Sequence, residues 1–383
     1  MERENETASV EAGNTETVRT CPGCGAVLQK DDPNRPGYVP PEQWERKAPL
    51  CLRCHRLLHY GEVVPVKLEA DEYRRQVEGL GATHAILLVV DLFDVEGSVL
   101  PELHRFVGTR RVIVAANKVD LLPQAHNPER IRAWLIGRLR ERGYDPEEVF
   151  LISAKSETGL PELFRRLEAE RRPVAVVGAA NVGKSSLLNR LIVRYGVKER
   201  VRLTTSRLPG TTLARVTIAL PNGKTVVDTP GVLPPGRLTP LLLPEELKIV
   251  LPRRRIDPRI YQLQAGQTLF LGGLGRVDFV EGERQPFVLY VSNELYVHRT
   301  KRERAEAVYA AHRGRLLRPP AEGRVPPLPE WRRHRFVIRP KGAPEKRDLD
   351  LGGIGWVVLN GVPAVVDVYL PHGVAPELRP AMI

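Results

Sequence analysis

A glycine-rich run near the middle of the chain has the residue types that bind phosphate. Residues 178–185 read Gly-Ala-Ala-Asn-Val-Gly-Lys-Ser, which fits the pattern GxxxxGK followed by Ser or Thr. In this pattern the glycines let backbone N–H groups face the phosphates, Lys184 reaches their outer oxygens, and the Ser185 hydroxyl can ligate Mg²⁺. The β-prone run 173–177 precedes the motif, and a helical pattern continues from Ser186. We therefore expect a nucleoside triphosphate to bind between a strand and a helix N-terminus.

Two motifs earlier in the chain predict that the base is guanine. They are the runs Asn117, Lys118, Val119, Asp120 and Ser153, Ala154, Lys155. Each follows an apolar run that reads as a buried strand, so both lie at the carboxyl edge of a sheet, where ligands bind. The Asp120 carboxylate can accept hydrogen bonds from N1–H and the amino group of guanine, a donor pair that adenine lacks. A backbone N–H of the second run is expected to meet the guanine oxygen.

The remaining motifs concern the γ-phosphate and its metal ion. Asp228 ends a short apolar strand and is expected in the Mg²⁺ shell, and the Gly231 backbone can sense the γ-phosphate. Thr212 is the predicted switch threonine on Mg²⁺, with Thr211 as the alternative. Val232 stands where a glutamine commonly orients the attacking water, and an apolar side chain cannot do so. The sequence therefore predicts slow intrinsic hydrolysis of GTP to GDP and phosphate.

These motifs occur in an unusual order. In an ordinary G domain the phosphate loop comes first, whereas here both base-reading motifs precede it. Strands alternate with helical patterns, and Asn127 followed by Pro128 predicts the start of one helix. Trp134 is expected in the core stripe of that helix. The predicted fold is a circularly permuted P-loop GTPase of the α/β class, with a doubly wound, mostly parallel sheet.

Four cysteines near the amino terminus form two CxxC pairs: Cys21, Cys24, Cys51 and Cys54. Four thiolates at this spacing are typical of a tetrahedral zinc site. A disulfide pair is disfavoured because a nucleotide-binding enzyme without a targeting segment is expected in a reducing compartment. A redox CxxC would need only one pair. His55 and His59 could replace a cysteine ligand, although both are expected to face RNA or solvent.

The composition predicts a soluble, cytoplasmic protein of several domains with a polyanionic partner. The 383 residues carry a formal charge of +12, and the apolar run Ala85–Val90 is too short to span a membrane. We expect a monomer. The predicted division is a disordered tail (1–20), a four-cysteine zinc module (21–62), the G domain (63–232), a switch-coupled segment (233–252) and a basic, β-rich, RNA-binding-like domain (253–383).

The carboxyl-terminal region combines strand patterns with clusters of positive charge. From Pro235 onward, 24 Lys and Arg stand against 16 Asp and Glu. Strands are expected at 287–291, 335–338, 354–359 and 364–370, a helix at 302–313, and a bulge or tight turn at 272–275. Candidate RNA phosphate contacts lie at 253–255, 299–304 and 332–335. The alternative for each cluster is a solvated surface.

The order of all these motifs, from the cysteine pairs to the basic tail, resembles the YqeH family of circularly permuted GTPases. The resemblance implies a factor that assembles the small ribosomal subunit and binds its precursor RNA. It assigns guanine to Asn117, Lys118 and Asp120, the guanine oxygen to Ser153 and Ala154, phosphate to Asn181, Val182, Gly183, Lys184, Ser185 and Ser186, and Mg²⁺ to Thr212 and Asp228. Hydrolysis is assigned to Asn181, Lys184, Thr212 and Gly231. Asn181 also resembles the asparagine of GTPases that use K⁺, although it could simply satisfy backbone groups of a tight loop.

Two other classes of function remain as alternatives. An RNA-modifying or tRNA-directed GTPase would need a second catalytic constellation, and an RNA-binding scaffold with weak GTPase activity would show broken motifs. We further expect that the segment Val232–Pro252 repositions the carboxyl-terminal region with nucleotide state, because it follows the γ-phosphate motif directly.

Overall fold

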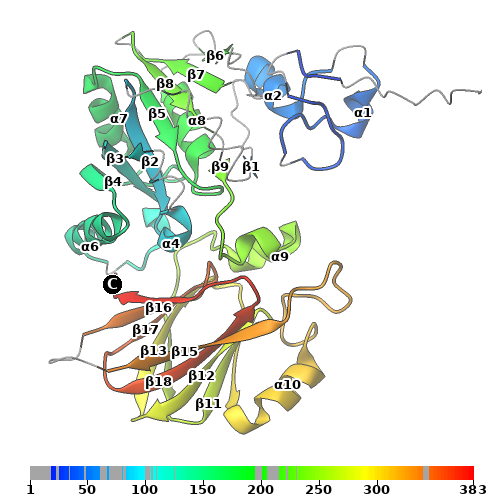
Figure 1. Ribbon diagram of the computed structural model, residues 1–383, viewed down its shortest axis with the longest axis vertical. Coiled ribbons are helices and arrows are strands. Elements are labelled where there is room, and N and C mark those ends of the chain that lie inside the picture. Colours follow the sequence, from blue (N-terminus) through cyan, green and yellow to red (C-terminus); the bar gives the residue numbers. More distant parts are fainter. Residues whose placement is uncertain are drawn as a thin grey trace, which may run out of the picture.

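The structure is a computed structural model. It describes residues 19–22, 26–33, 35–46, 49–60, 67–68, 80, 83–99, 104, 107–108, 110–124, 126–194, 201–204, 215–220, 223–229, 231–339 and 345–383. Cys24, Thr211 and Thr212 lie outside the described residues, as does most of the predicted tail. Two larger bodies and a small amino-terminal module are visible in Figure 1.

The central body is built on one seven-stranded, mostly parallel sheet. Its strands, in spatial order, are β4 (Asp145–Leu151), β3 (Arg111–Asn117), β2 (Ala85–Asp91), β5 (Val174–Val177), β8 (Thr225–Asp228), β7 (Arg215–Ala219) and β6 (Val201–Thr204). The first five run parallel, and β7 is antiparallel to both of its neighbours. Every residue of β2 and β5 is buried, as expected for strands covered on both faces.

Helices connect these strands, and α6 begins where the sequence predicts. They are α4 (Val95–Ser98), α6 (Pro128–Glu141), α7 (Leu160–Ala169) and α8 (Lys184–Arg194), with the 3-10 turn η1 (Val119–Leu121). The Asn127 side chain caps α6 by accepting from the backbone N–H groups of Glu129 and Arg130, and Pro128 occupies the first position. The fold is thus the permuted α/β fold that the motif order predicts.

The carboxyl-terminal body consists of two five-stranded antiparallel sheets. One has the order β10 (Arg259–Leu263), β13 (Gln285–Val291), β17 (Gly355–Leu359), β16 (Arg347–Asp350) and β19 (Glu377–Pro380). The other has the order β14 (Val297–Lys301), β11 (Gln267–Leu271), β12 (Gly275–Gly282), β18 (Ala364–Pro371) and β15 (Trp331–Ile338). Phe279 and Phe287 meet between the sheets with ring centroids 5.0 Å apart. The turn η3 (Arg302–Arg304) leads into the helix α10 (Ala305–His312).

The carboxyl-terminal body shows what the sequence pattern found and what it missed. All four predicted strands and the tight turn at 272–275 are present, the turn closing the β11–β12 hairpin at the pair Leu271 and Gly275. The six strands β10, β11, β12, β14, β16 and β19 were not predicted. Trp134 needs correction: it is only partly buried, and its indole Nε1 donates to the backbone oxygen of Pro380 at 2.8 Å. It therefore packs between the two bodies rather than inside the first.

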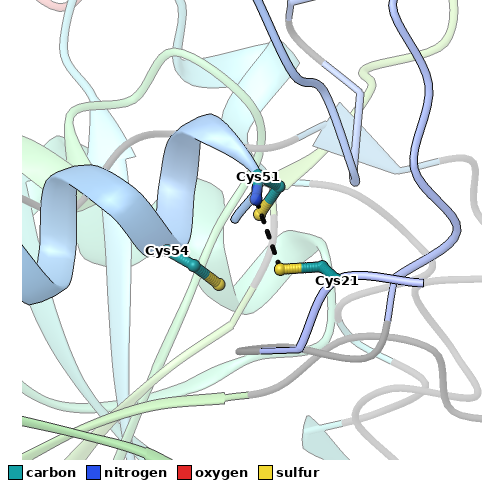
Figure 2. Close-up of side chains that lie close together, drawn as sticks. All are labelled: Cys21, Cys51 and Cys54. Atoms are coloured by element: carbon teal, nitrogen blue, oxygen red, sulfur yellow. Dashed lines mark hydrogen bonds between the residues drawn. The ribbon is translucent and has the colours of Figure 1, made fainter. Parts of the chain in front are cut away.

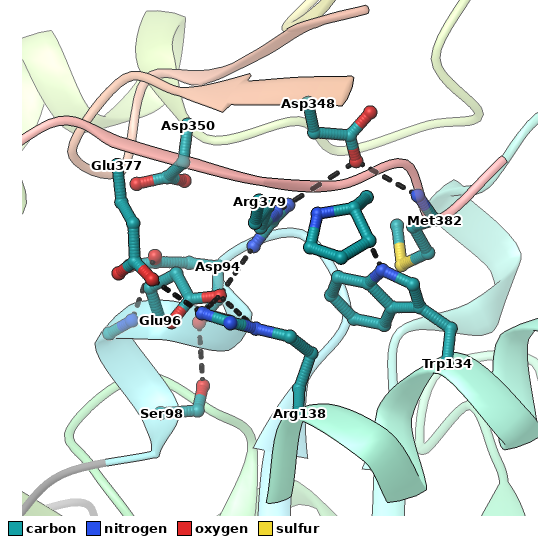
Figure 3. Close-up of polar contacts among 12 residues, drawn as sticks. Asp94, Glu96, Ser98, Trp134, Arg138, Asp348, Asp350, Glu377, Arg379 and Met382 are labelled. Carbon is teal, nitrogen blue, oxygen red and sulfur yellow. Dashed lines mark hydrogen bonds and ion pairs between the residues drawn. The ribbon is translucent and has the colours of Figure 1, made fainter. Parts of the chain in front are cut away.

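Ion pairs of buried arginine side chains hold the two bodies together (Figure 3). Arg138 of α6 pairs with Glu96 of α4 at 2.9 Å and with Glu377 of β19 at 2.6 Å. Arg379 of β19 also reaches Glu96, at 3.1 Å. The connecting segment carries η2 (Thr239–Leu241) and α9 (Pro244–Val250).

The same connecting segment is anchored at its start by Arg237. This buried side chain pairs with Asp350 of β16 at 2.7 Å and with Asp94 beside α4. The segment is therefore tied to both bodies by charge.

The amino-terminal module contains α1 (Pro41–Trp44) and α2 (Leu52–Tyr60), and short β-bridges join Thr20 to Val27 and Gln29 to Tyr38. The chain then reaches β1 (Lys67–Leu68), which pairs in parallel with β9 (Gly231–Val232). The segment that enters the central body, β1, thus lies beside the segment that leaves it, β9.

Candidate nucleotide site and metal centre

The phosphate loop lies between β5 and α8, at the carboxyl edge of the central sheet. Gly183 has a positive φ of 97°, and a Cβ there would lie 2.2 Å from the side-chain nitrogen of Asn117, so only glycine fits. The Lys184 ammonium donates to the backbone oxygens of Gly178 at 2.8 Å and Ala179 at 2.7 Å. An ammonium has three donors, so one remains for a phosphate oxygen. Burial lowers the pKa of Lys184 to about 8, against the charge of Asp228, which raises it.

Asn117 ties the base-reading motifs to the phosphate loop. Its amide nitrogen donates to the backbone oxygen of Val182 at 2.9 Å, and its oxygen accepts from the backbone N–H of Ala154 at 3.0 Å. Lys118 has a left-handed backbone with φ of 70°, and its ammonium pairs with Asp91 at the end of β2. Three loops that are distant in sequence are therefore fixed against one another through one side chain.

A cavity of about 640 Å³ opens beside these motifs, a size typical of small-molecule sites. The cavity is lined by Asn117, Lys118, Asp120, Leu121, Ser153, Ala154, Lys155, Gly183, Ser186, Asn189, Arg190, Pro252 and Arg253. Six of these residues are the ones predicted to bind the guanine base: Asn117, Lys118, Asp120, Ser153, Ala154 and Lys155. The cavity can accept a purine base next to the Asp120 carboxylate.

Part of the cavity wall comes from outside the central body. Pro252 and Arg253 follow α9 and precede β10. The Lys155 ammonium donates to the backbone oxygen of Arg253, and the backbone N–H of Ile256 donates to the oxygen of Leu121 at 2.9 Å. We call residues 252–256 the base-side segment. It joins the carboxyl-terminal body to both base-reading loops.

The opposite end of the site is formed by Asp228 and Gly231. A Cβ at Gly231 would lie 2.8 Å from the Ala180 Cα and 3.1 Å from the Lys184 ammonium nitrogen, so this glycine approaches the phosphate loop closely. The Val232 side chain is fully buried, and its backbone oxygen accepts from the Ala180 N–H at 2.7 Å. Its side chain therefore does not orient water, in keeping with the apolar residue type.

Asp228 is a buried carboxylate at the end of β8. Its Oδ1 has no hydrogen-bond partner within the described part of the chain. Burial raises the pKa of Asp228, while the charges of Arg53 and Lys184 lower it. A carboxylate oxygen of this kind can ligate Mg²⁺ or accept a hydrogen bond from a water bound to Mg²⁺, so the residues present fit the metal that a GTPase site implies.

Three of the four cysteines meet in the amino-terminal module (Figure 2). The sulfur atoms of Cys21, Cys51 and Cys54 all lie within 4.8 Å of one another, and all three residues are buried. The backbone N–H of Cys51 donates to the Cys21 sulfur at 3.3 Å, which favours a thiolate there. Three converging sulfurs fit a tetrahedral zinc ion. His59 is exposed and His55 half-buried, and neither belongs to the sulfur cluster.

Several residues of the site were not singled out from the sequence. Arg190 lines the base cavity four residues after Ser186, and its Nε donates to the Ala154 oxygen at 2.9 Å. Helical spacing could have placed it there. The sequence singled out Arg253 as an RNA contact and not for the base cavity. It gave no signal for Arg53, which lies close to Asp228.

Comparison with known proteins agrees with this arrangement. Residues 106–236 match the family described as RsgA GTPase, and residues 284–382 match the family described as YqeH-like, C-terminal. The permuted sheet and these matches define the class of protein: a circularly permuted GTPase, which binds GTP and GDP with Mg²⁺ and hydrolyses GTP. YqeH of Bacillus subtilis is 38% identical over 366 residues, covering 95% of this chain and 99% of that protein. The chain therefore belongs to the YqeH family.

More distant relatives are found in plants and animals. A GTP-binding protein of Arabidopsis thaliana, brassinazole insensitive pale green 2, chloroplastic, is 31% identical over 350 residues, covering 81% of this chain and 52% of that protein. Human nitric oxide-associated protein 1 is 27% identical over 522 residues, covering 95% of this chain and 74% of that protein.

No helix in the described part of the chain is long and apolar enough to cross a membrane.

Proposed function

We propose that this GTPase is an assembly factor for the small ribosomal subunit and binds ribosomal RNA in a nucleotide-dependent way. The observation that carries the proposal is that a basic carboxyl-terminal body is bonded to the loops that carry the guanine-nucleotide motifs. A large net positive charge favours a polyanionic partner over a small acidic substrate. The proposed setting is a compartment that contains ribosomes, the cytoplasm in a bacterial cell.

The surface of the carboxyl-terminal body supports an RNA partner. Arg253, Arg254 and Arg255 are exposed in the base-side segment, and Arg332 and Arg333 are exposed on the edge strand β15. Exposed arginines suit phosphate contacts because the guanidinium can bind two oxygens at once. Arg335 and Arg254 are weaker candidates because Asp367 holds the first at 2.7 Å and Glu294 holds the second at 3.1 Å.

Within the nucleotide site we propose a division of roles. Asn117, Lys118, Asp120, Ser153, Ala154 and Lys155 hold the base, residues 181–186 hold the phosphates, and Ser185, Thr212 and Asp228 hold Mg²⁺. Asn181 has a left-handed backbone, with φ of 67°, and is exposed, so its side chain is available for a K⁺ ion. The four cysteines hold structural zinc, three of them already converging.

Co-sedimentation with purified small subunits tests the proposal. Wild-type protein is mixed with subunits in GDP, in a non-hydrolysable GTP analogue, and without nucleotide, and the pelleted fraction is measured. We expect binding to small rather than large subunits that changes with the nucleotide. Binding that ignores both the nucleotide and the kind of subunit would instead favour an RNA scaffold, and binding to transfer RNA alone would favour a tRNA-directed GTPase.

Potassium use needs a separate assay. GTP turnover is compared in matched potassium and sodium buffers at fixed Mg²⁺. We expect faster turnover in potassium, and an N181A variant that no longer distinguishes the two ions. Equal wild-type rates would contradict the proposed ion.

A further inference from the structure

A charged side chain of the amino-terminal module reaches Asp228 of the proposed nucleotide site. Arg53 stands between Cys51 and Cys54 in the first turn of α2. Its Nη2 lies 3.7 Å from the Oδ2 of Asp228, and both side chains are buried. Asp228 also interacts through its charge with Lys184 of the phosphate loop. The module thus places a guanidinium at the end of the site where phosphate charge collects.

The position of Arg53 follows from the geometry of the cysteine cluster. Cys51 and Cys54 are three residues apart, so their sulfurs share one side of the first helical turn and converge on Cys21. Arg53, one residue before Cys54, points in a different direction around the helix axis. Any ion that fixes the cysteines therefore also fixes the direction in which the guanidinium leaves the helix.

The burial of Arg53 indicates a role beyond holding the module in place, because a module can dock on the central body without a buried arginine. Removing a guanidinium from water is costly unless a charged partner and further hydrogen bonds compensate. A planar guanidinium is also the cation that best matches phosphate oxygens, since it donates two parallel hydrogen bonds. The positive charge of Arg53 and its position beside Asp228 therefore fit phosphate binding better than they fit docking of the module alone.

We infer that Arg53 is a positioning residue of the nucleotide site, contributed by the cysteine module, whose guanidinium supplies positive charge to the phosphates beside Asp228. The inference rests on the proposed assignment of residues 181–186 and Asp228 to the phosphates and their metal. It does not depend on a ribosomal partner, so the subunit assay can fail while this inference holds.

The test compares R53Q with a control on the same helix, R56Q, whose arginine is exposed. The dissociation constant of a fluorescent GDP is measured with and without added Mg²⁺, and zinc content is measured for each variant. We expect R53Q to bind GDP about tenfold more weakly without Mg²⁺. The loss should be smaller with Mg²⁺, because the metal neutralises part of the phosphate charge. R53K should recover part of the affinity, and R56Q should match the wild type.

Two results would overturn the inference. R53Q with full zinc and wild-type GDP affinity would show that Arg53 only docks the module. Tighter GDP binding by R53Q in Mg²⁺ would show that the guanidinium competes with the metal for Asp228.

A second comparison covers the case in which R53Q loses zinc because Asp228 is left buried and uncompensated. In a D228N background that carboxylate charge is absent. Adding R53Q to D228N should still weaken GDP binding about tenfold without Mg²⁺. No additional loss in the double variant would count against the inference.

Discussion

The central body has two junctions, and they meet the nucleotide site at opposite ends. The carboxyl-terminal body reaches the base end through the base-side segment and is held further away by the buried pairs of Arg138, Arg237 and Arg379. The cysteine module reaches the phosphate end, where Arg53 meets Asp228 and β1 pairs with β9 at Gly231. GTP and GDP share a base and differ only in the γ-phosphate. We therefore propose that the first junction reports whether a nucleotide is bound and that the second reports which one.

This difference changes the expectation for the segment Val232–Pro252. From the motif order alone, this segment was expected to move the carboxyl-terminal body with nucleotide state. Its Arg237 is bonded to both bodies, and its end is tied to the base-reading loops. Movement at the amino-terminal module is now the better hypothesis.

The largest expected effect is the loss of Arg237. R237A would remove the cation that pairs with both the partly buried Asp94 and the buried Asp350, and we expect the free energy of unfolding to fall by about 3–5 kcal/mol. Denaturant unfolding measures this. R254A, which removes an exposed pair with Glu294, is the control and should cost about 0–1 kcal/mol. A small effect of R237A would mean that the carboxyl-terminal junction is not the rigid one.

The next effect concerns the base end alone. D120A removes the proposed acceptor for two guanine donors, and we expect binding to weaken by about 3 kcal/mol, roughly a hundredfold. The loss should be equal for GDP and for a non-hydrolysable GTP analogue, because both carry the same base. Titration of both nucleotides against D120A and wild type checks this. Unequal losses would break the division between base end and phosphate end.

Zinc removal should act at the phosphate end. Without zinc the turn that carries Arg53 is no longer fixed, so C51S is expected to weaken GDP binding without Mg²⁺ about tenfold, as R53Q does. The matched control is C51S combined with R53Q, which should lose nothing further. If zinc-free C51S binds nucleotide with wild-type affinity, the cysteine module does not contribute to the nucleotide site.

The smallest effect is expected from the base-side segment. R253A shortens an exposed wall of the base cavity while its backbone bond to Lys155 remains, and we expect an affinity loss of about threefold, or ~0.7 kcal/mol, for GDP and GTP analogue alike. The neighbouring variant R254A should bind as wild type, since Arg254 does not line the cavity. A loss confined to the GTP analogue would mean that this junction also senses the γ-phosphate.

The central fold could be predicted from the sequence because its signals are local. Apolar strands end directly at the binding motifs, so residues such as Asn117 and Lys184 are placed by the strand and helix beside them. The strands of the carboxyl-terminal sheets were harder to predict from the sequence. Strand β12 carries Arg276 and Asp278, buried charges 3.3 Å apart, and such a pair reads as polar surface in a sequence.

The two junction residues could not be predicted for a related reason. Arg53 and Asp228 are far apart in the chain, and an arginine inside a CxxC pair has the composition of a solvated turn. Arg253 belongs to a run of three arginines that looks uniform, yet it alone of the three lines the cavity. Long-range contacts of charged side chains leave no periodic trace, because only the folded chain brings the partners together.

Because β1 pairs with β9, the first and last strands of the central body lie side by side, so the path of its chain is nearly circular. Leu68 and Val232 are direct partners in that two-stranded clasp. A short peptide joining Val232 to the chain after Leu68 could therefore close this circle, and a new opening just before Pro173 would put the phosphate loop first again. Such a rearranged central body would keep every strand of its seven-stranded sheet but would no longer be attached to the amino-terminal module or the carboxyl-terminal body. The ordinary and permuted arrangements would then differ only in where the same circular chain is opened.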